Sequence, residues 1–431
     1  SPDSGISVKL SALHPRYEYS QSARVLEELV PRLAELARLA RDAGIGLTID
    51  AEEADRLDLS LDVIERVFAD DGLGDWNGFG VAVQAYQRRA VPVLDWLGAL
   101  SRRVRRPLNI RLVKGAYWDT EIKRTQEQGF DSYPVFTRKA STDVSYIACI
   151  RWLFAAKAPI FPQFATHNAQ TVAAVRALAP KGALYEFQRL HGMGEALYET
   201  VSDVSDVPCR VYAPVGRHED LLPYLVRRLL ENGANSSFVN RLAKRDLPVA
   251  EVIADPIAKT VSRKATPSPE IPSPRATLEA GRIAAAGLDL SDRVVVNALV
   301  ADMAAAEEGN NWQAGPIVDG KPKAGKAHDV AGPADRRRKL GFVTDANEDD
   351  VEPICLSSWR SRFAREVKRL AMPLPRFERR WIFAATMRRA PAATLRSRYR
   401  CPARRESATL CRSAEGAFSP VSAPGIFRWR S

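Results

Sequence analysis

A cation, a glycine and two large aromatic side chains follow the short apolar run Asn109–Val113. These residues are Lys114, Gly115, Tyr117 and Trp118. The run itself contains one charged side chain, Arg111, and its composition is typical of a strand buried on both faces. Such a group just past the end of a buried strand would form a suitable mouth for a flat, anionic ligand. The alternative is a core strand whose aromatic neighbours contribute only packing.

Polar side chains also follow several other apolar runs of the chain. They are Lys9, Asp50, Gln84, His167, Gln188, His191 and Tyr212. Each type has an ordinary alternative role. An aspartate such as Asp50 could cap a helix, a lone histidine is more often structural than catalytic, and a tyrosine could pack in the core. The recurrence of the pattern favours a shared site over these separate roles.

The elements that must position these residues alternate between strand and helix. The apolar runs predict strands at 6–10, 46–50, 80–86, 109–113, 160–168, 185–192 and 208–215. Helical spacing predicts helices over 20–41, 59–67, 91–103, 142–156, 172–178 and 221–232, the last ended by Gly233. Such alternation predicts parallel strands with right-handed crossovers, in an α/β fold.

Seven strand–helix units fit a (β/α)8 TIM-type barrel with one unit missing better than an open doubly wound sheet. No Gly-x-Gly-x-x-Gly motif follows any strand, so the usual signature of a dinucleotide-binding sheet is absent from the sequence. In a barrel the functional residues collect at the carboxyl ends of the strands. That edge is where the polar side chains named above are expected.

The net charge of +11 does not describe the whole chain. From Val351 to Ser431 there are 18 Lys and Arg against five Asp and Glu, so the basic excess belongs to this tail. Five cysteines in 431 residues form no disulfide framework or zinc motif, and no metal site is expected. This cysteine usage fits a reducing cytoplasm. No apolar stretch of about 18 residues and no signal peptide is present.

Several longer motifs become specific when taken together and in order. They are SVKLSALHPRY, IDAEEADRL, RLVKGAYWDTEIKR, PQFATHN, YEFQRLHGMGE, RVYAPVG and YLVRRLLENGANSSFVNR. Over about residues 5–262 the chain resembles the proline dehydrogenase barrel of the bifunctional proline utilization A (PutA) flavoenzymes. The resemblance implies an enzyme that binds FAD and oxidises L-proline to Δ1-pyrroline-5-carboxylate. It also implies a quinone as electron acceptor, and with it peripheral contact with the inner face of the plasma membrane.

The resemblance assigns residues to the substrate. Arg227 and Arg228, with Lys9, would hold the carboxylate of proline, since guanidinium groups bind carboxylates in a bidentate manner. Without the motif, we would interpret two adjacent arginines on a helix as part of its solvent-exposed face. Tyr117 and Tyr212 would bound the pocket of the small ring. A close analogue such as hydroxyproline is not distinguished from proline by these residues.

The resemblance also assigns residues to the cofactor. Lys9, Asp50 and Arg111 are the expected catalytic residues, with Asp50 beside the flavin and Arg111 near its N5, where a fixed cation would stabilise charge on the reduced ring. The other expected cofactor residues are Ala51, Gln84, Val113, Lys114, Gly115, Trp118, Thr137, Arg138, Lys139, Thr166, His167, Asn168, Gln188, Leu190 and Glu231. Among these, residues 137–139 and 166–168 would meet the pyrophosphate or adenosine part. His167 is assigned to binding and not to proton transfer.

The chain also departs from the family pattern. It begins with Ser1, just before what would be the family's second strand, so we expect the barrel to lack its first strand and to have two open edges. The family's N-terminal DNA-binding segment is absent from the sequence, and no specific nucleic acid partner is expected. The alternative function is therefore an inactive or unstable remnant of a broken bifunctional gene. The oligomeric state is left open.

Four regions are predicted. Residues 1–262 are the barrel, 263–284 a Pro/Ser-rich linker, and 285–350 a partial N-terminal segment of an aldehyde dehydrogenase domain, by resemblance of the motif NNWQAGPIVDGK. Residues 351–431 form a basic, irregular tail. Codons that encode the end of this tail can be read in a shifted frame to give a Ser-Pro-Trp-Asn-Phe-Pro loop typical of aldehyde dehydrogenases, so we interpret the tail as a frameshifted translation. The alternative is a basic arm that binds nucleic acid.

Overall fold

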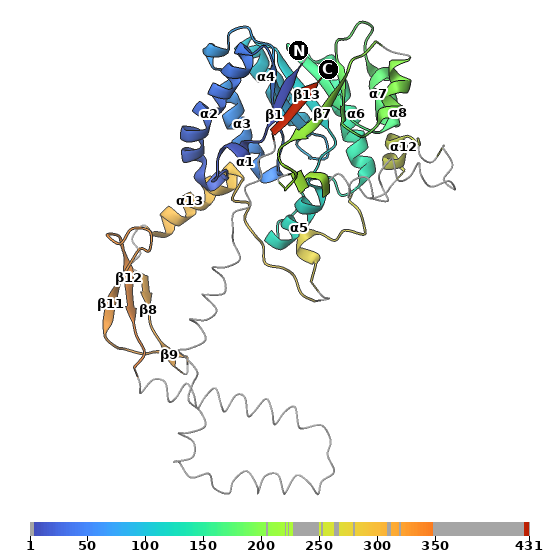
Figure 1. Cartoon of the computed structure of the whole chain (residues 1–431). Coiled ribbons are helices and arrows are strands. Elements are labelled where there is room, and N and C mark those ends of the chain that lie inside the picture. Colours follow the sequence, from blue (N-terminus) through green and yellow to red (C-terminus); the bar gives the residue numbers. More distant parts are fainter. Residues whose placement is uncertain are drawn as a thin grey trace, which may run out of the picture. The chain divides into compact units, whose positions relative to one another are not determined.

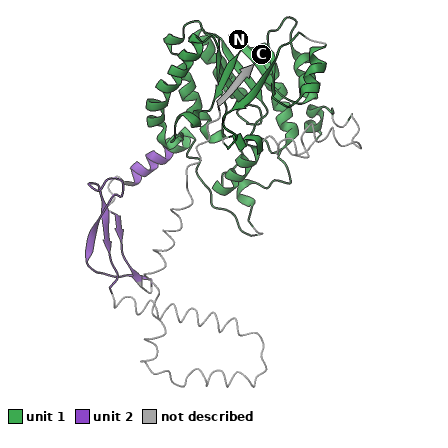
Figure 2. Cartoon of the chain, viewed as in Figure 1, with its two compact units in different colours: residues 1–297, 421–431 green, residues 298–420 purple. Residues whose placement is uncertain are grey.

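The structure is a computed structural model of the chain (Figure 1). It describes residues 4–203, 206–219, 221–222, 224–226, 250, 253–262, 267–278, 281–307, 312–318, 320–347 and 426–430. Two compact units are distinguished, one of residues 1–297 with 421–431 and one of residues 298–420 (Figure 2). The first unit contains the predicted barrel and the predicted linker.

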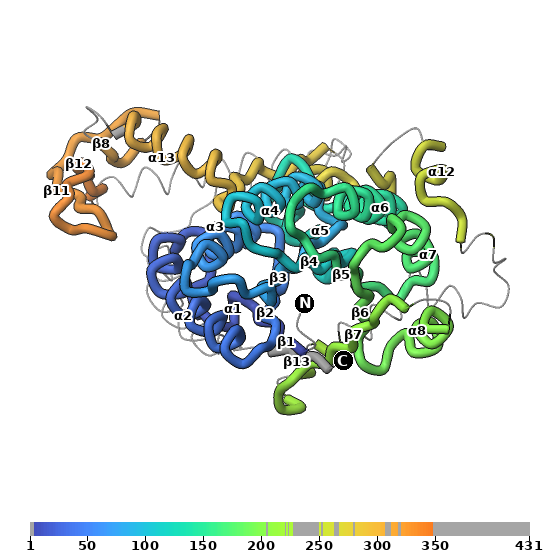
Figure 3. Tube along the Cα trace, turned by 90° about the horizontal axis from the view of Figure 1, so that it is seen from above, coloured from blue at the N-terminus to red at the C-terminus, as the bar shows by residue number. Residues whose placement is uncertain are grey.

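Seven neighbouring parallel strands curl into the barrel of the first unit. They are β1 (Gly5–Val8), β2 (Gly46–Ile49), β3 (Phe79–Gln84), β4 (Leu108–Val113), β5 (Ile160–Ala165), β6 (Glu186–Leu190) and β7 (Cys209–Val215). Seen from above, they form a ring with the helices outside it (Figure 3). The predicted barrel is therefore confirmed, with strand ends that differ by a few residues from those expected.

The helices that follow the strands cover the outer face of this ring. They are α2 (Ser22–Asp42), α3 (Leu57–Phe68), α4 (Ala90–Val104), α6 (Lys139–Ala155), α7 (Ala169–Leu178) and α8 (Glu195–Ser202). The apolar core lies between helices and sheet, where side chains such as Leu33 of α2, Leu94 of α4 and Phe187 of β6 are fully buried. Burial of such a continuous apolar layer is the main favourable contribution to folding.

The inward face of the strands is more polar than the face towards the helices. Because successive strand residues point to opposite sides, Ile110 and Leu112 of β4 join the apolar core while Arg111 points into the barrel. Arg111 is in register with Ala82 of β3 and Gln163 of β5, and both Arg111 and Gln163 are buried. The barrel interior therefore holds polar groups that must bond to one another or to a ligand.

The sheet closes through an element that the sequence did not predict. Strand β13 (Ile426–Arg430) lies between β1 and β7 and pairs with both in antiparallel orientation. The expectation of two open sheet edges is therefore wrong for this structure, and so is the expectation of an irregular tail for residues 426–430. The rest of the tail lies outside the described residues.

Among the described residues, four α-helices that lie wholly in the first unit were missed, and one of them is α12 (Pro256–Val261), just before the predicted linker. Helix α1 (Leu10–Leu13) begins where a strand end and a polar loop were expected, α5 (Trp118–Gln128) follows β4, and α8 follows β6. In α5 only Ile122 is both apolar and buried, so the sequence lacks the apolar stripe by which helices are recognised. Most of the predicted helix over 221–232 lies outside the described residues.

The predicted linker and the following segment contain short elements. Helix α12 (Pro256–Val261) precedes the linker, and helix α13 (Arg293–Glu307) follows it. In the second unit, strands β8 (Trp312–Ala314), β11 (Ala327–Ala331) and β12 (Lys339–Thr344) form a sheet in the order β11-β12-β8, and β9 (Ile317–Val318) pairs with β10 (Lys321–Pro322). Among the described residues, no helix is long and apolar enough to cross a membrane.

Replacement of Phe187 by alanine should test the core between sheet and helices. The Phe187 ring is fully buried and packs 5.6 Å from the Tyr185 ring and 5.7 Å from the Tyr198 ring, measured between centroids. We expect Phe187→Ala to lower the free energy of unfolding by about 3–5 kcal/mol, measured by urea denaturation. The control is Leu184→Ala, because Leu184 is 81% exposed and its loss should change stability by less than about 0.5 kcal/mol. Equal effects of the two substitutions would contradict this packing.

Candidate active site

A buried ion pair lies at the centre of the site. Arg111 Nη1 of β4 donates to Asp50 Oδ1 at 2.8 Å, and Arg111 Nη2 donates to Ser7 Oγ at 2.8 Å. The side chains of Arg111 and Asp50 are 7% and 17% exposed. Asp50 directly follows β2, and Ser7 belongs to β1, so three strands contribute. Ser7 was not predicted, although its polarity inside an apolar strand is a weak signal for an inward position.

Small residues of β3 separate the strands that this ion pair joins. Gly80 and Ala82 stand on the strand between β2 and β4, with Ala82 in register with Arg111. A Cβ atom on Gly80 would lie 2.8 Å from Thr48 Oγ1, which is closer than side-chain atoms normally approach. The small residues on β3 therefore leave room for Arg111 to reach across to Asp50.

Lys9 and Tyr117 form a second contact at the same end of the barrel. Lys9 Nζ donates a hydrogen bond to Tyr117 Oη, and it lies 5.1 Å from the centroid of the Tyr117 ring. Burial alone would lower the pKa of Lys9, but Tyr117, Asp50 and Glu52 act in the opposite direction and leave it raised. Lys9 is therefore a cation at neutral pH. The guanidinium carbon of Arg111 lies 5.9 Å from the ring centroid of Tyr212. The structure thus brings together five predicted residues, here called the barrel mouth: Lys9, Asp50, Arg111, Tyr117 and Tyr212.

The electrostatics of the pair reflect its burial. Burial raises the pKa of Asp50 and the nearby Glu52 carboxylate adds to the rise, while the positive charges of Arg111 and Lys9 limit it without cancelling it. Arg111 and Lys9 thus place two cations beside the Asp50 carboxylate, while the neighbouring Glu52 is paired with Arg56. Two such buried cations suit an anionic ligand, such as a carboxylate or a reduced flavin ring.

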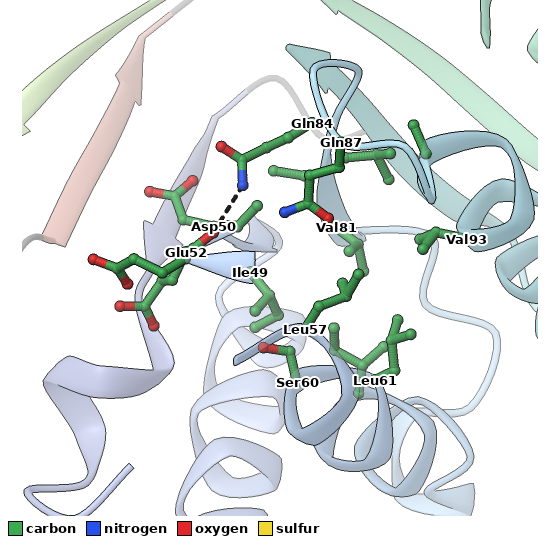
Figure 4. Close-up of a pocket in the computed structure, with 16 residues that line it drawn as sticks. Ile49, Asp50, Glu52, Leu57, Ser60, Leu61, Val81, Gln84, Gln87 and Val93 are labelled. Atoms are coloured by element: carbon green, nitrogen blue, oxygen red, sulfur yellow. Dashed lines mark hydrogen bonds between the residues drawn. The ribbon is translucent and has the colours of Figure 1, made fainter. Parts of the chain in front are cut away.

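The end of β3 contributes a glutamine that is fixed on both sides. Gln84 Nε2 donates to the backbone oxygen of Glu52 at 2.8 Å, and Gln84 Oε1 accepts from Ala116 N at 3.2 Å. Asp50, Glu52 and Gln84 line one end of a pocket between β2, β3 and α3, whose other walls include Ile49, Leu57 and Val81 (Figure 4). Ala51 lines the same pocket. The pocket itself is narrow, and the five residues of the barrel mouth are a better candidate for the reaction site.

Glu52 is a buried carboxylate that was not singled out from the sequence. It accepts from Ser11 N at 3.0 Å, from Ser11 Oγ and from Arg56 Nη1 at 2.8 Å. The acidic run 50–53 was a signal, but the sequence alone did not show which of its carboxylates is buried. Glu52 ties α1, which follows Lys9, to the loop that carries Asp50.

The segment between β4 and α5 has the conformation that its glycine allows. Gly115 has a φ of +144°, and a Cβ atom there would lie 2.4 Å from Cγ of Tyr86. Val113 O and Lys114 O accept from the backbone N–H groups of residues 85 and 86 at 2.8 and 2.7 Å. The close packing of Gly115 on Tyr86 therefore sets the path of the chain towards Tyr117 and Trp118. Trp118 Nε1 donates to Phe136 O at 2.8 Å.

Two predicted lysines meet at one carboxylate of α6. Lys114 Nζ lies 2.6 Å from Asp143 Oδ1, and Lys139 Nζ lies 2.7 Å from Asp143 Oδ2. Burial alone would raise the pKa of Asp143, but the two lysines hold it below its usual value. The structure therefore brings Lys114 and Lys139 together. Asp143 was not predicted.

Thr137 and Arg138 contact the predicted linker. Arg138 Nε and Nη2 donate to Pro267 O at 3.0 and 2.8 Å, and Ser268 N donates to Thr137 Oγ1 at 2.9 Å. These hydrogen bonds join residues 137 and 138 to the linker and not to the barrel mouth. Their assignment to the pyrophosphate or adenosine part stays a prediction.

The residues after β5 have definite backbone partners. His167 Nε2 accepts from Leu190 N at 3.0 Å, so this nitrogen is not protonated in the bond. Thr166 Oγ1 accepts from Asn168 N at 3.2 Å, and Asn168 Oδ1 caps α7 by accepting from Thr171 N at 3.1 Å. These contacts position the loop beside the end of β6. They do not test its assignment to the cofactor.

Gln188 presents a buried carbonyl oxygen that could accept a hydrogen bond from a flavin. Its side chain is fully buried inside the barrel, and Nε2 donates to Glu186 Oε1 at 2.7 Å. Within the described part of the chain, Gln188 Oε1 has no hydrogen-bond partner, and the same holds for Gln163 Oε1. Buried acceptors without a partner are uncommon in folded proteins. Together with the cations of the barrel mouth, they fit a ligand that combines ring N–H groups with negative charge, as a flavin does.

Three predicted residues are not placed. Arg227, Arg228 and Glu231 lie outside the described residues. Their assignment to the substrate carboxylate and to the cofactor therefore stays a prediction.

Comparison with known proteins connects this geometry to a family. A family model described as proline dehydrogenase matches residues 1–241. The chain is 51% identical over 362 residues to the bifunctional protein PutA of Salmonella typhimurium, which covers 81% of this chain and 27% of that protein. The chain thus spans about a quarter of the length of this curated relative.

Solved structures show the same likeness. A crystal structure of a proline utilization A mutant from Bradyrhizobium japonicum is 55% identical, with a TM-score of 0.68, and the match covers 69% of this chain and 31% of that one. The proline utilization A of Bdellovibrio bacteriovorus, solved after inactivation by N-propargylglycine, is 29% identical with a TM-score of 0.69. That match covers 80% of this chain and 36% of that one.

Glu121 gives the site a pH-dependent contact. This buried carboxylate of α5 accepts from Ala54 N at 2.7 Å and so joins the segment after Tyr117 to the loop after Asp50. Burial raises the pKa of Glu121 to about 7, and the nearby Asp55 and Glu53 add to the rise. Because the pKa is higher in the folded state, the stabilisation is present below pH 4.5 and is lost as the pH rises through about 7.

We therefore expect Glu121→Gln to stabilise the protein more at pH 8 than at pH 5. Each pKa unit corresponds to about 1.4 kcal/mol, so the gain at pH 8 should be about 1–3 kcal/mol, measured by urea denaturation at both pH values. The matched control is Glu127→Gln on the exposed side of the same helix, which should show no such pH dependence. A gain that is equal at the two pH values would contradict the account of Glu121.

Proposed function

The chain belongs to the proline dehydrogenase family, and we propose that its barrel oxidises L-proline to Δ1-pyrroline-5-carboxylate by hydride transfer to bound FAD. The observation that supports this most is the gathering of Lys9, Asp50, Arg111, Tyr117 and Tyr212 at one end of the barrel. They come from four separate parts of the chain, and the family model covers all of them.

The reaction requires that proline be held with C5 towards the acceptor and with its amine neutral. When bound, FAD supplies the hydride acceptor at its ring. The cationic side of the site would hold the substrate carboxylate away from the reacting carbon, so that C5 is the part of the ring that faces the cofactor. We assign this anchoring to Lys9, with Arg227 and Arg228.

Arg111 and Asp50 have a different task in this proposal. Arg111 is held rigidly by Asp50 and Ser7, so its charge needs no reorganisation during the reaction. A fixed cation favours the accumulation of negative charge on the reduced cofactor. Tyr117 and Tyr212 would limit the pocket to a ring of about the size of proline.

The electron acceptor and the cellular location are also part of this proposal. We place the enzyme in the cytoplasm and propose that the electrons pass to a quinone at the inner face of the plasma membrane, as part of proline breakdown. The longer relative PutA is named a bifunctional protein, and this chain spans about a quarter of its length. Residues 285–350 are proposed to be part of an aldehyde dehydrogenase domain, without an activity of their own.

The test is formation of product by the purified full chain loaded with FAD. With L-proline and a water-soluble quinone analogue, we expect Δ1-pyrroline-5-carboxylate to form, trapped as its adduct with o-aminobenzaldehyde, and the quinone to be reduced in equal amount. D-proline serves as the substrate control. A chain that retains FAD but forms no product would contradict the proposed function.

The Lys9→Met variant tests the carboxylate anchor. Loss of a charged hydrogen bond to a bound ligand costs about 3 kcal/mol, so we expect kcat/KM for L-proline to fall by about 100-fold, mainly through KM. The matched control is Lys123→Met, because Lys123 of α5 is 73% exposed and has no assigned role in the site. A Lys9→Met enzyme with the KM of the parent chain would remove Lys9 from the anchor.

A further inference from the structure

Inside the barrel, Glu186 of β6 is the acceptor for four donors. Arg210 Nε and Nη2 donate to its two carboxylate oxygens, each at 2.8 Å, Gln163 Nε2 donates at 2.9 Å and Gln188 Nε2 at 2.7 Å. The Glu186 residue is 3% exposed. The donors stand on β5, β6 and β7, and register pairs Gln163 with Glu186 and Gln188 with Arg210.

The chemistry of Glu186 decides how the two glutamine amides are turned. A carboxylate held by both arms of a guanidinium is ionised and can only accept hydrogen bonds. Each glutamine must therefore present its NH2 group to Glu186 and its carbonyl oxygen to the opposite side. An amide at position 186 would carry donors of its own and would not impose this orientation.

The orientation matters most at Gln188. It lies two residues beyond Glu186 along β6 and so closer to the carboxyl end of the strand, where the site lies. Its side chain is fully buried, and its Oε1 meets no donor among the described residues. A fixed, desolvated acceptor of this kind selects a ligand that brings a donor and rejects one that does not.

We propose that Glu186 is a positioning residue that fixes the carbonyl oxygen of Gln188 towards the ligand, so that the site selects a flat heterocycle with a ring N–H. This inference rests on the proposed function, in which the ligand is FAD. Oxidised flavin has one ring N–H, at N3, and methylation there removes the donor. The competing interpretation is that Glu186 serves only as the counter-charge of Arg210.

The experiment compares FAD with its N3-methyl analogue as ligands of the full chain, with dissociation constants from flavin fluorescence. For the parent chain we expect FAD to bind about tenfold more tightly than the analogue, the size expected for one hydrogen bond. In Glu186→Gln the amide of Gln188 is free to turn, and the preference should fall below about threefold. Gln188→Leu should lose the preference to the same extent, and the double variant should lose no more.

Two further variants separate orientation from stability. Gln163→Leu removes the other unpartnered buried acceptor together with a donor of Glu186, but it leaves the bond between Glu186 and Gln188. We expect this variant to keep the tenfold preference, and a preference lost in Gln163→Leu but kept in Gln188→Leu would overturn the assignment to Gln188. Because Glu186→Gln removes the negative charge that compensates the buried Arg210 and so threatens folding, Glu186→Gln combined with Arg210→Gln is the second test. It removes both charges and should show the same loss of preference.

The outcomes distinguish this inference from the function on which it rests. A parent chain that binds no FAD would overturn the proposed function and the inference with it. A parent chain that binds FAD, with a preference that survives in Glu186→Gln or in the paired variant, would overturn the inference alone. Equal weakening of both ligands in these variants would likewise show that Glu186 acts only as a counter-charge.

Discussion

A guanidinium buried inside the barrel is the constraint on which the site depends. An uncompensated charge in that position would cost several kcal/mol, so Arg111 requires a carboxylate within reach. Asp50 supplies it from the end of β2, two strands away, and the small residues of β3 leave the space between. The ion pair thus fixes the positions of β1, β2 and β4 relative to one another at the edge where the polar residues collect.

The barrel divides its tasks between its two faces. TIM barrels usually fill their interior with branched apolar side chains, but here buried arginine, glutamine and glutamate side chains occupy part of it. The apolar layer between sheet and helices provides most of the stability, as the fully buried Leu33, Leu94 and Phe187 indicate. The polar interior is then available for chemistry, provided that each charge has a partner. Asp50 meets this need for Arg111, and Glu186 meets it for Arg210.

Helices and strands with regularly spaced apolar residues were predicted from the sequence, and those without such spacing were not. Strand β4 and helix α2 have regular apolar spacing and were placed to within a few residues, whereas α5 has one buried apolar residue and was missed. Strand β13 could not be predicted, because its partners β1 and β7 lie more than 200 residues before it in the chain. Pairing over such distances depends on the tertiary structure and leaves no local pattern.

The same distinction holds for the site. Motif resemblance identified Lys9, Asp50 and Arg111, and the structure brings them together with Tyr117 and Tyr212. The resemblance did not identify the residues that hold these side chains or their neighbours in place, such as Ser7, Glu52 and Glu186. The roles of these residues depend on which side of a strand or loop faces inward. The resemblance also did not reveal that Arg138 donates to the carbonyl of Pro267, a contact across 129 positions of the chain.

The most direct measurement is the visible absorption spectrum of the full chain with FAD, recorded without oxygen before and after addition of L-proline. The account predicts flavin bands that bleach when proline is added, because the cations, the tyrosines and the cofactor then act in one assembled site. Flavin bands that stay unchanged at saturating proline would contradict it, since they would show a cofactor bound where the substrate cannot reduce it.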